Sequence, residues 1–223
     1  VRRSPRFSYT ETARIRGLLG VHEAVGAGRS STREDVTVVP LRDGGEIVLR
    51  PLGTDDEQAM VRLHRRCSRE TLRRRYLSSM AAPSPALLRL LVDGGSCTAF
   101  AATAGTELLG MAHLSHTQDG IAEVAVLVED AHQRRGIGAS LLAACAEEAV
   151  ARRIRSLTAI CLPDNDAFPA LIAGCGYRAT QHLDDGLRVL TFPLPRPQEA
   201  VVVDDGARRF AREARDHRLW WTR

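Results

Sequence analysis

The sequence predicts an α/β (α+β) fold in which helices flank one mixed β-sheet. Three tight-turn signals each lie between two apolar runs, which is the pattern of antiparallel hairpins. They are Asp43-Gly44, Gly105 and Asp185-Gly186. A further run, Ile121 to Val128, has Glu123 as its one charged residue, so we expect a strand in the middle of the sheet that is covered on both faces. Segments with the apolar spacing of helices separate these strands.

Before this central run, the sequence predicts two hairpins separated by helices. Thr54 and Glu57 have the spacing of a capping box, which begins a first helix. A second helix follows Ser68 and ends before Pro83. The predicted elements are strands at 36–41 and 46–51, the two helices, a short helical turn at 85–91, and strands at 97–103 and 108–114.

After the central run, a loop ends at Gly138 and a longer helix follows at 139–153. Its apolar side consists of Leu141, Leu142, Cys145, Ala149 and Val150. The remaining predicted elements are a strand at 157–162, a short helix at 167–173, and a closing hairpin of strands at 177–182 and 187–192.

Length and composition predict one globular domain with an extension on each side. Hydrophobic residues make up 44% of the 223 residues and charged residues 26%, the balance of a soluble protein. We expect an N-terminal extension or linker at 1–35, the folded domain at 36–195, and a C-terminal extension at 196–223 with a helix near 207–219. No apolar run reaches the roughly 18 to 20 residues of a membrane span, so we expect a cytoplasmic protein without a membrane partner.

The formal net charge of +4 comes from arginine, since the chain has no lysine. This mild excess suits a phosphate-bearing ligand without requiring nucleic acid, so we expect no nucleic-acid partner. The five cysteines contain no Cys-x-x-Cys pair, and the strand spacing of His113 and His116 puts their side chains on opposite faces. We therefore expect no metal site. The sequence leaves open whether the protein is a monomer or a homodimer.

The segment from Gln133 to Ala139 has the features of an anion-binding loop. It lies between the central strand and the helix at 139–153, where backbone N–H groups converge on a negative ligand. Gly136 and Gly138 allow a close approach to the main chain and positive φ angles. A Rossmann fingerprint would need a third glycine, and a Walker loop would need a lysine that this chain lacks.

This loop resembles the acetyl-CoA loop of the GNAT superfamily of N-acetyltransferases, Gln/Arg-x-x-Gly-x-Gly/Ala, at Gln133, Gly136 and Gly138. A second block of that superfamily, Asn-x-x-Ala-x-x-Leu-Tyr-x-x-x-Gly-Phe, is matched in order by Asn165, Leu171, Gly176 and Tyr177. The resemblance covers about residues 46–193. It implies a mostly antiparallel sheet, splayed between the strands at 121–128 and 157–162, with acetyl-CoA as co-substrate in the gap.

The resemblance also implies which residues hold the co-substrate. Backbone groups of Val126 and Val128 pair with pantetheine, and N–H groups from 134 to 139 hold the pyrophosphate. Arg134 and Arg135 add positive charge, unless they are simply a solvated pair. Asn165 either lines the cleft or caps the short helix after it. The full predicted set is Val126, Leu127, Val128, Gln133, Arg134, Arg135, Gly136, Ile137, Gly138, Ala139, Ser140 and Asn165.

Glu123 is the candidate catalytic residue. An amine acceptor must lose a proton before it attacks, and a carboxylate in an apolar strand has a pKa shifted toward the working pH by desolvation. In the Pat-type bacterial protein lysine acetyltransferases the strand is similar to Ala122-Glu123-Val124-Ala125, and its Glu is the base. The alternative is a carboxylate at a wet strand end that balances a nearby arginine.

One position departs from the GNAT pattern. Many members carry a Tyr that protonates the leaving thiolate, and Ile172 stands there in this chain. The thiolate is then protonated by water or the cofactor environment, or by another group. Cys175 and Tyr177 are close in the sequence, although Tyr177 replaces the usual core Phe.

The acceptor is less well defined by the sequence. Between 62 and 75 there are seven arginines, which form either a docking site for an acidic or phosphate-bearing group or a solvated helix face. They are Arg62, Arg65, Arg66, Arg69, Arg73, Arg74 and Arg75. The segments at 48–52 and 68–76 resemble the opening of Pat-type domains, which favours a protein lysine as acceptor. A small amine, such as an antibiotic or polyamine, and a non-catalytic acyl-CoA-binding module are the alternatives.

Overall fold

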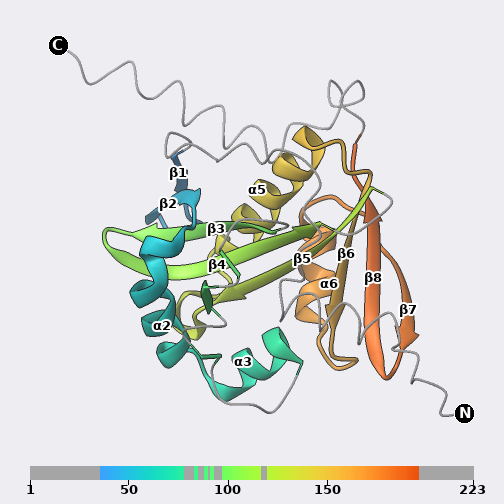
Figure 1. The fold of residues 1–223 in the computed structure, drawn as a ribbon, viewed down its shortest axis with the longest axis horizontal. Coiled ribbons are helices and arrows are strands. Elements are labelled where there is room, and N and C mark those ends of the chain that lie inside the picture. The colour runs from blue at the N-terminus through green and yellow to red at the C-terminus, as the bar shows by residue number, and fades with distance from the viewer. Residues whose placement is uncertain are drawn as a thin grey trace, which may run out of the picture.

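The computed structural model describes residues 36–77, 83–84, 88–89, 91–92, 97–116 and 120–195, except for the side chain of His116 (Figure 1). The extensions predicted at 1–35 and 196–223, the helix expected near 207–219 and most of the turn at 85–91 lie outside these residues. No helix among them is long and apolar enough to cross a membrane.

The structure confirms the predicted fold class. One eight-stranded sheet has the order β1-β2-β3-β4-β5-β6-β8-β7, and every neighbouring pair is antiparallel except β5 with β6. The strands are β1 (Thr37–Pro40), β2 (Glu46–Pro51), β3 (Cys97–Ala104), β4 (Glu107–His116), β5 (Ile121–Val128), β6 (Ser156–Cys161), β7 (Thr180–Asp184) and β8 (Leu187–Pro193). The helices are α2 (Glu57–Arg66), α3 (Arg69–Tyr76), α5 (Ile137–Ala151) and α6 (Ala167–Gly174), with short 3-10 turns η1 (Thr54–Asp56) and η2 (Asp130–His132).

The sheet opens between β5 and β6. These parallel strands pair at only three positions, from Ile121 opposite Ser156 to Glu123 opposite Thr158. Beyond Glu123, β5 continues alongside β4 to Val128, whereas β6 continues alongside β8. The expected splay is therefore present, and Glu123 lies at the point where the two strands part.

Helices cover the two faces of the sheet and create two cores (Figure 1). α5 and α6 lie on one face, where Leu141, Leu142 and Ile172 pack against alternate residues of β4, β5, β6 and β8. α2 and α3 lie on the other face, where Met60, Leu63 and Leu72 pack against residues of β3, β4 and the far end of β5. Burying these side chains stabilises the fold by roughly 1.5 to 3 kcal/mol for each large apolar residue.

The coverage of β5 differs from the prediction. Leu127 is buried in the α2-facing core, but Ile121, Glu123 and Ala125 on that same face are only half-buried. The physical reason is that side chains of α2 and α3 enclose Leu127 near the carboxyl end of β5, whereas the other end is less enclosed on this face. Glu123 therefore lies on a face that solvent and substrate can reach.

Several element boundaries differ from the prediction by one to three residues, and three of them have a local structural cause. Asp56, not Glu57, is the capping residue: its carboxylate accepts a hydrogen bond from the Gly53 N–H at 3.0 Å. The helical segment therefore begins with the 3-10 turn η1, which precedes α2. α5 begins two residues earlier than expected, since Gly136 already adopts the position before the helix. β7 begins at Thr180 rather than 177, because the chain first returns from α6.

Candidate active site

The carboxyl half of β5 presents an unpaired backbone edge to the gap in the sheet. The Glu129 N–H donates to the Leu109 carbonyl at 2.9 Å, which identifies that pair as hydrogen-bonded in the β4–β5 register. Antiparallel pairing alternates, so Val124, Val126 and Val128 direct their N–H and C=O groups away from β4, toward β6. β6 has already separated from β5 at this point. Two of the predicted residues, Val126 and Val128, thus lie on a strand edge that a ligand can approach, although the Val128 carbonyl already accepts a hydrogen bond from the Gln133 side chain.

Leu127, which was also predicted to bind the co-substrate, is placed differently. Its side chain lies in the core beneath α2, and the same alternation directs its backbone groups to β4. Only its neighbours face the gap.

The start of α5 has the properties of an anion site. Gly136 precedes the helix with φ of 105°, and no side chain caps the exposed N–H groups of the first turn. The first turn carries no acidic residue, so the positive end of the helix dipole has no counter-charge there. The N–H groups of Ile137, Gly138 and Ala139 have no intrahelical acceptor by their position, whereas the Ser140 N–H donates to the Gly136 carbonyl.

The two glycines of the loop differ in what they require. At Gly136 an added Cβ would meet no atom closer than 4.0 Å, but the φ of 105° is unfavourable for any other residue. At Gly138 an added Cβ would make ordinary contact with Leu171 at 3.6 Å. The positive φ therefore explains why a glycine stands at position 136. For Gly138 the reason stays the predicted one, that a ligand must approach the main chain closely.

Side chains tie the loop to its surroundings. Gln133 donates through Nε2 to the Val128 carbonyl at 3.1 Å and to Thr71 Oγ1 at 3.2 Å. Asp130 accepts hydrogen bonds from the Ser68 N–H, the Ser68 hydroxyl and the Thr71 hydroxyl, each at 2.7 Å. The loop that was predicted to bind the co-substrate is thus bonded directly to the first turn of α3.

Positive charge surrounds the loop from two sides. Arg135 pairs with Asp43 at 2.5 Å, and its Nη1 lies 2.7 Å from His132 Nδ1. Arg134 is exposed with φ of 64°, and Arg42, in the β1–β2 turn, is exposed beside Gly136. Sequence analysis did not identify Arg42, because no local motif reports that the β1–β2 turn docks on this loop.

Glu123 is half-buried, and burial raises its pKa from 4.5 to about 7, while the charge of Arg75 acts in the opposite direction. Its cross-strand neighbours are Ser115 on β4 and Thr158 on β6. Ser115 donates weakly to the Cys97 sulfur at 3.7 Å. Glu123 is therefore a carboxyl with uncharged polar neighbours on both adjacent strands and the Arg75 charge nearby, and its pKa is suited to accepting a proton near neutral pH.

A second polar group lies beside Glu123 and was not predicted. Arg75 Nη2 is 3.2 Å from Nδ1 of His113, and the Arg75 guanidinium carbon is 4.9 Å from the centre of the Tyr76 ring. The Tyr76 hydroxyl is 2.6 Å from Nε2 of His64, whose Nδ1 lies 2.7 Å from the Met60 carbonyl. These contacts join α2, α3 and β4 next to the candidate base, and no local motif in the sequence indicates them.

The arginines at 62–75 divide into four kinds, one of which is Arg75 with its contacts to His113 and Tyr76. Arg66 is internal: its Nε pairs with Glu129 at 2.9 Å and its Nη2 donates to the Leu108 carbonyl at 2.7 Å. Arg73 and Arg74 both pair with Glu70, and Arg73 also reaches Asp164. Three are exposed and have no ion pair among the described residues: Arg62, Arg65 and Arg69. The cluster is therefore not one uniform docking surface.

The second sequence block begins just before α6 and ends just after it, and its residues serve mainly in helix capping and packing. Asn165 is buried and accepts a hydrogen bond from the Phe168 N–H at 3.3 Å, which caps the helix. Ile172 is 1% exposed and cannot supply a proton. The Tyr177 ring packs 5.2 Å from Phe192, and burial raises the pKa of its hydroxyl. Burial likewise raises the pKa of the Cys175 thiol.

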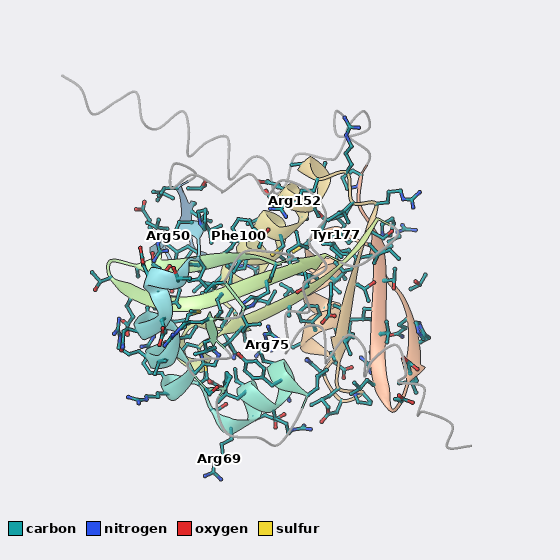
Figure 2. The ribbon with its side chains drawn as sticks, in the orientation of Figure 1. Arg50, Arg69, Arg75, Phe100, Arg152 and Tyr177 are labelled. Atoms are coloured by element: carbon teal, nitrogen blue, oxygen red, sulfur yellow. The ribbon has the colours of Figure 1, made fainter. Side chains whose placement is uncertain are left out.

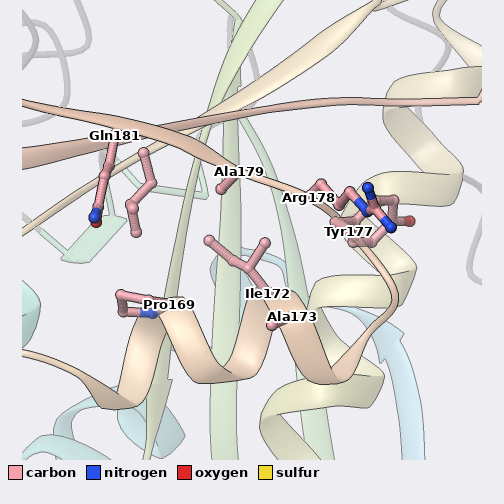
Figure 3. A pocket seen from close by; sticks show the side chains of 8 residues that line it. Pro169, Ile172, Ala173, Tyr177, Arg178, Ala179 and Gln181 are labelled. Atoms are coloured by element: carbon pink, nitrogen blue, oxygen red, sulfur yellow. The ribbon is translucent and has the colours of Figure 1, made fainter.

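A shallow pocket lies between α6 and the chain that leads into β7 (Figure 3). Its lining includes Ile172, Tyr177, Arg178 and Gln181. No residue of the β5 edge or of the loop before α5 belongs to the lining. This pocket is therefore separate from the site built around Glu123.

Comparisons with known proteins agree with the resemblance to GNAT acetyltransferases that the sequence motifs indicate. The family model of the acetyltransferase (GNAT) family matches residues 58–177. The crystal structure of the GNAT domain of S. lividans PAT is 30% identical, with 71% of this chain and 97% of that chain covered and a TM-score of 0.67.

Two more distant structures share the fold. The PaiA N-acetyltransferase from Thermoplasma acidophilum, in complex with coenzyme A, is 15% identical, covering 65% of this chain and 97% of that chain, with a TM-score of 0.54. A cAMP-binding acyltransferase from Mycobacterium smegmatis, in a mutant form, is 24% identical over 81% of this chain, with a TM-score of 0.51. The match spans 54% of that longer protein.

Proposed function

The chain belongs to the GNAT family of acetyltransferases, and we propose that it transfers the acetyl group of acetyl-CoA to a lysine side chain of a protein, with Glu123 as general base. The observation that carries this proposal is the position of Glu123. It stands where β5 and β6 part, at one end of the unpaired β5 edge.

The described residues fit acetyl-CoA. The backbone groups of Val126 and the N–H of Val128 can pair with the amides of pantetheine as an added strand would, while the Val128 carbonyl already accepts a hydrogen bond from Gln133. The uncapped first turn of α5 offers N–H groups and a helix dipole to the pyrophosphate, with Arg134 and Arg42 supplying charge. Bound acetyl-CoA supplies an activated thioester, and these residues orient it toward Glu123.

Glu123 suits the proton transfer that the reaction requires. A lysine ammonium has a pKa of about 10.4 and cannot attack until a base removes its proton. With a pKa of about 7, Glu123 is largely ionised at slightly alkaline pH yet basic enough to accept a proton. Because Ile172 replaces the usual Tyr, the acid that protonates the thiolate does not come from that position.

Two observations support a protein lysine as the acceptor. The segments at 48–52 and 68–76 resemble Pat-type protein lysine acetyltransferases, and the S. lividans PAT domain is 30% identical. The acceptor side also carries Arg75 close to the base and exposed arginines on α2 and α3. A polyamine would be repelled by this charge, whereas a lysine in an acidic protein segment would be attracted.

The test combines binding and turnover. Acetyl-CoA binding is measured by calorimetry on wild-type protein and Glu123→Gln, and transfer is measured on a panel of lysine peptides and a panel of aminoglycosides and polyamines. We expect both proteins to bind acetyl-CoA equally, and only the wild type to acetylate peptides, with a loss of at least about a hundredfold in the variant.

Each other outcome removes a different part of the proposal. Full activity of Glu123→Gln would exclude Glu123 as the base. Preference for the small amines would replace the lysine assignment. Binding without turnover on either panel would favour a non-catalytic acyl-CoA-binding module.

A further inference from the structure

Arg75 carries a half-buried positive charge that the proposed reaction does not yet use. We propose that Arg75 is a positioning residue: its guanidinium, held over the sheet by His113 and Tyr76, keeps the neighbouring Glu123 carboxylate charged and ready to accept a proton. This inference rests on the proposed role of Glu123 as base.

The position of Arg75 differs from that of other arginines on the same helix. In Figure 2, Arg75 lies on the side of α3 that faces the sheet, whereas Arg69 points away from the molecule. Arg75 is half-buried, with Nη2 at 3.2 Å from His113 Nδ1. No carboxylate among the described residues lies within salt-bridge distance of it. Its charge is therefore not neutralised by an ion pair in the described part of the chain.

His113 can hold Arg75 without competing with it electrostatically. Arginine donates at every accessible pH, so Nδ1 of His113 must be the acceptor and the ring proton must be on Nε2. Burial lowers the pKa of His113 well below 6.5, so the ring stays neutral. Its Nε2 has no hydrogen-bond partner in the described structure, which leaves Arg75 as the contact that orients the ring.

The strand register brings this pair next to Glu123. His113 stands opposite Ala125 on β5, and Glu123 is two residues before Ala125 on the same face of the strand. Diagonal cross-strand neighbours of this kind are about 7 to 8 Å apart, within reach of a long side chain from the helix above. Arg75 accordingly lowers the pKa of Glu123, in opposition to the burial that raises it.

The other groups around Glu123 contribute no charge near neutral pH. On the strands these are Ser115, Thr158 and Cys97, and burial raises the pKa of the Cys97 thiol. On the helices, burial raises the pKa of Tyr76 and lowers that of His64, so both are neutral. Arg75 is thus the cation that offsets the desolvation of Glu123 within the described structure.

The consequence is a specific pH signature. Removing the charge of Arg75 lets the pKa of Glu123 rise further, by about one pH unit, the low end of the shift that a nearby opposite charge produces. Less base is then available at low pH, whereas at high pH the carboxylate is ionised in either protein. The wild-type to Arg75→Gln ratio of kcat/KM should therefore be about tenfold at pH 6 and approach one at pH 9. The ionisation of the acceptor cancels in this ratio.

The experiment measures the titration of Glu123 without requiring turnover. Carboxyl-labelled glutamate is followed by carbon NMR from pH 5 to 9, and the Glu123 signal is the one missing from Glu123→Gln. We expect Arg75→Gln to raise the midpoint by about one pH unit. Arg75→Lys, which keeps the charge, should stay within about 0.3 unit of wild type, and so should the exposed control Arg69→Gln.

The kinetic ratio is measured in parallel with a capped lysine tripeptide as acceptor. A midpoint unchanged in Arg75→Gln would overturn the inference, and so would an equal displacement in Arg75→Lys, since packing rather than charge would then be responsible. A ratio that stays constant from pH 6 to 9 would also overturn it. Failure of the proposed function is distinguishable, because it would appear as undiminished transfer by Glu123→Gln.

Discussion

Glu123 should make the protein less stable as the pH rises, because its charge is formed in a partly desolvated place. Its pKa is raised from 4.5 to about 7, with burial as the largest cause. Below pH 4.5 both the folded and the unfolded chain hold the proton, and no free energy is at stake. Between these values only the folded chain keeps it, so the free energy of unfolding falls as pH rises.

The size of this effect follows from the two values. At about 1.4 kcal/mol for each pH unit, the full difference corresponds to about 3 kcal/mol above pH 7, of which roughly 2.5 kcal/mol develops between pH 5 and pH 8. Replacing Glu123 with Gln removes the titration while keeping the shape of the protonated side chain. Glu123→Gln should therefore be more stable than wild type by about 3 kcal/mol at pH 8, and by less than about 1 kcal/mol at pH 5.

Urea unfolding of both proteins at pH 5 and pH 8 measures this difference directly. The gap between the two proteins should widen by about 2 to 3 kcal/mol at the higher pH, with m-values unchanged. A gap that differs by less than about 0.5 kcal/mol between the two pH values would refute the reasoning. Glu123 would then be well solvated, and its suitability as a base near neutral pH would lose its physical cause.

Two further predictions concern the supports of the site. Gly136→Ala should lower stability by about 1 to 2 kcal/mol and weaken acetyl-CoA binding by calorimetry, because its φ of 105° is strained for alanine; Gly174→Ala, with open space and no positive φ, is the matched control and should change neither. Glu129→Gln should cost about 2 kcal/mol in urea unfolding, because Arg66 loses its buried partner while Glu107 still lies 3.4 Å away. An unchanged free energy of unfolding in Gly136→Ala would contradict the strain argued from φ, and an unchanged value in Glu129→Gln would contradict the stabilising role of the pair with Arg66.

The sequence predicted those parts of the molecule that depend on local pattern. Asp185 and Gly186 have φ angles of 48° and 74°, as the turn expected between β7 and β8 requires. The apolar run at 121–128 coincides with β5, and the loop before α5 carries its positive φ at Gly136. Each of these features is encoded within a few neighbouring residues, where turn chemistry and periodicity are informative.

The sequence did not predict features that depend on contacts between distant segments. Nothing near Arg42 indicates that its turn lies beside Gly136, and nothing near Arg75 indicates that His113 receives its hydrogen bond. The dense arginines of α2 and α3 looked alike in the sequence, although Arg66 is internal and Arg65 is exposed. Which arginines form ion pairs within the fold and which stay exposed is decided by how the helices pack on the sheet.

The position of α3 explains how one short helix can serve both sides of the site. Its first turn is bonded to Asp130, immediately after β5, and Arg73 pairs with Asp164, after β6, at 3.0 Å. α3 therefore spans the two strands that diverge at Glu123 and carries Arg75 toward the base. Because Gln133 also joins this helix to the end of β5, the loop before α5 and the surroundings of Glu123 belong to one hydrogen-bonded unit. We therefore expect a displacement of that loop to be transmitted to α3, and with it to the charge that Arg75 presents to Glu123.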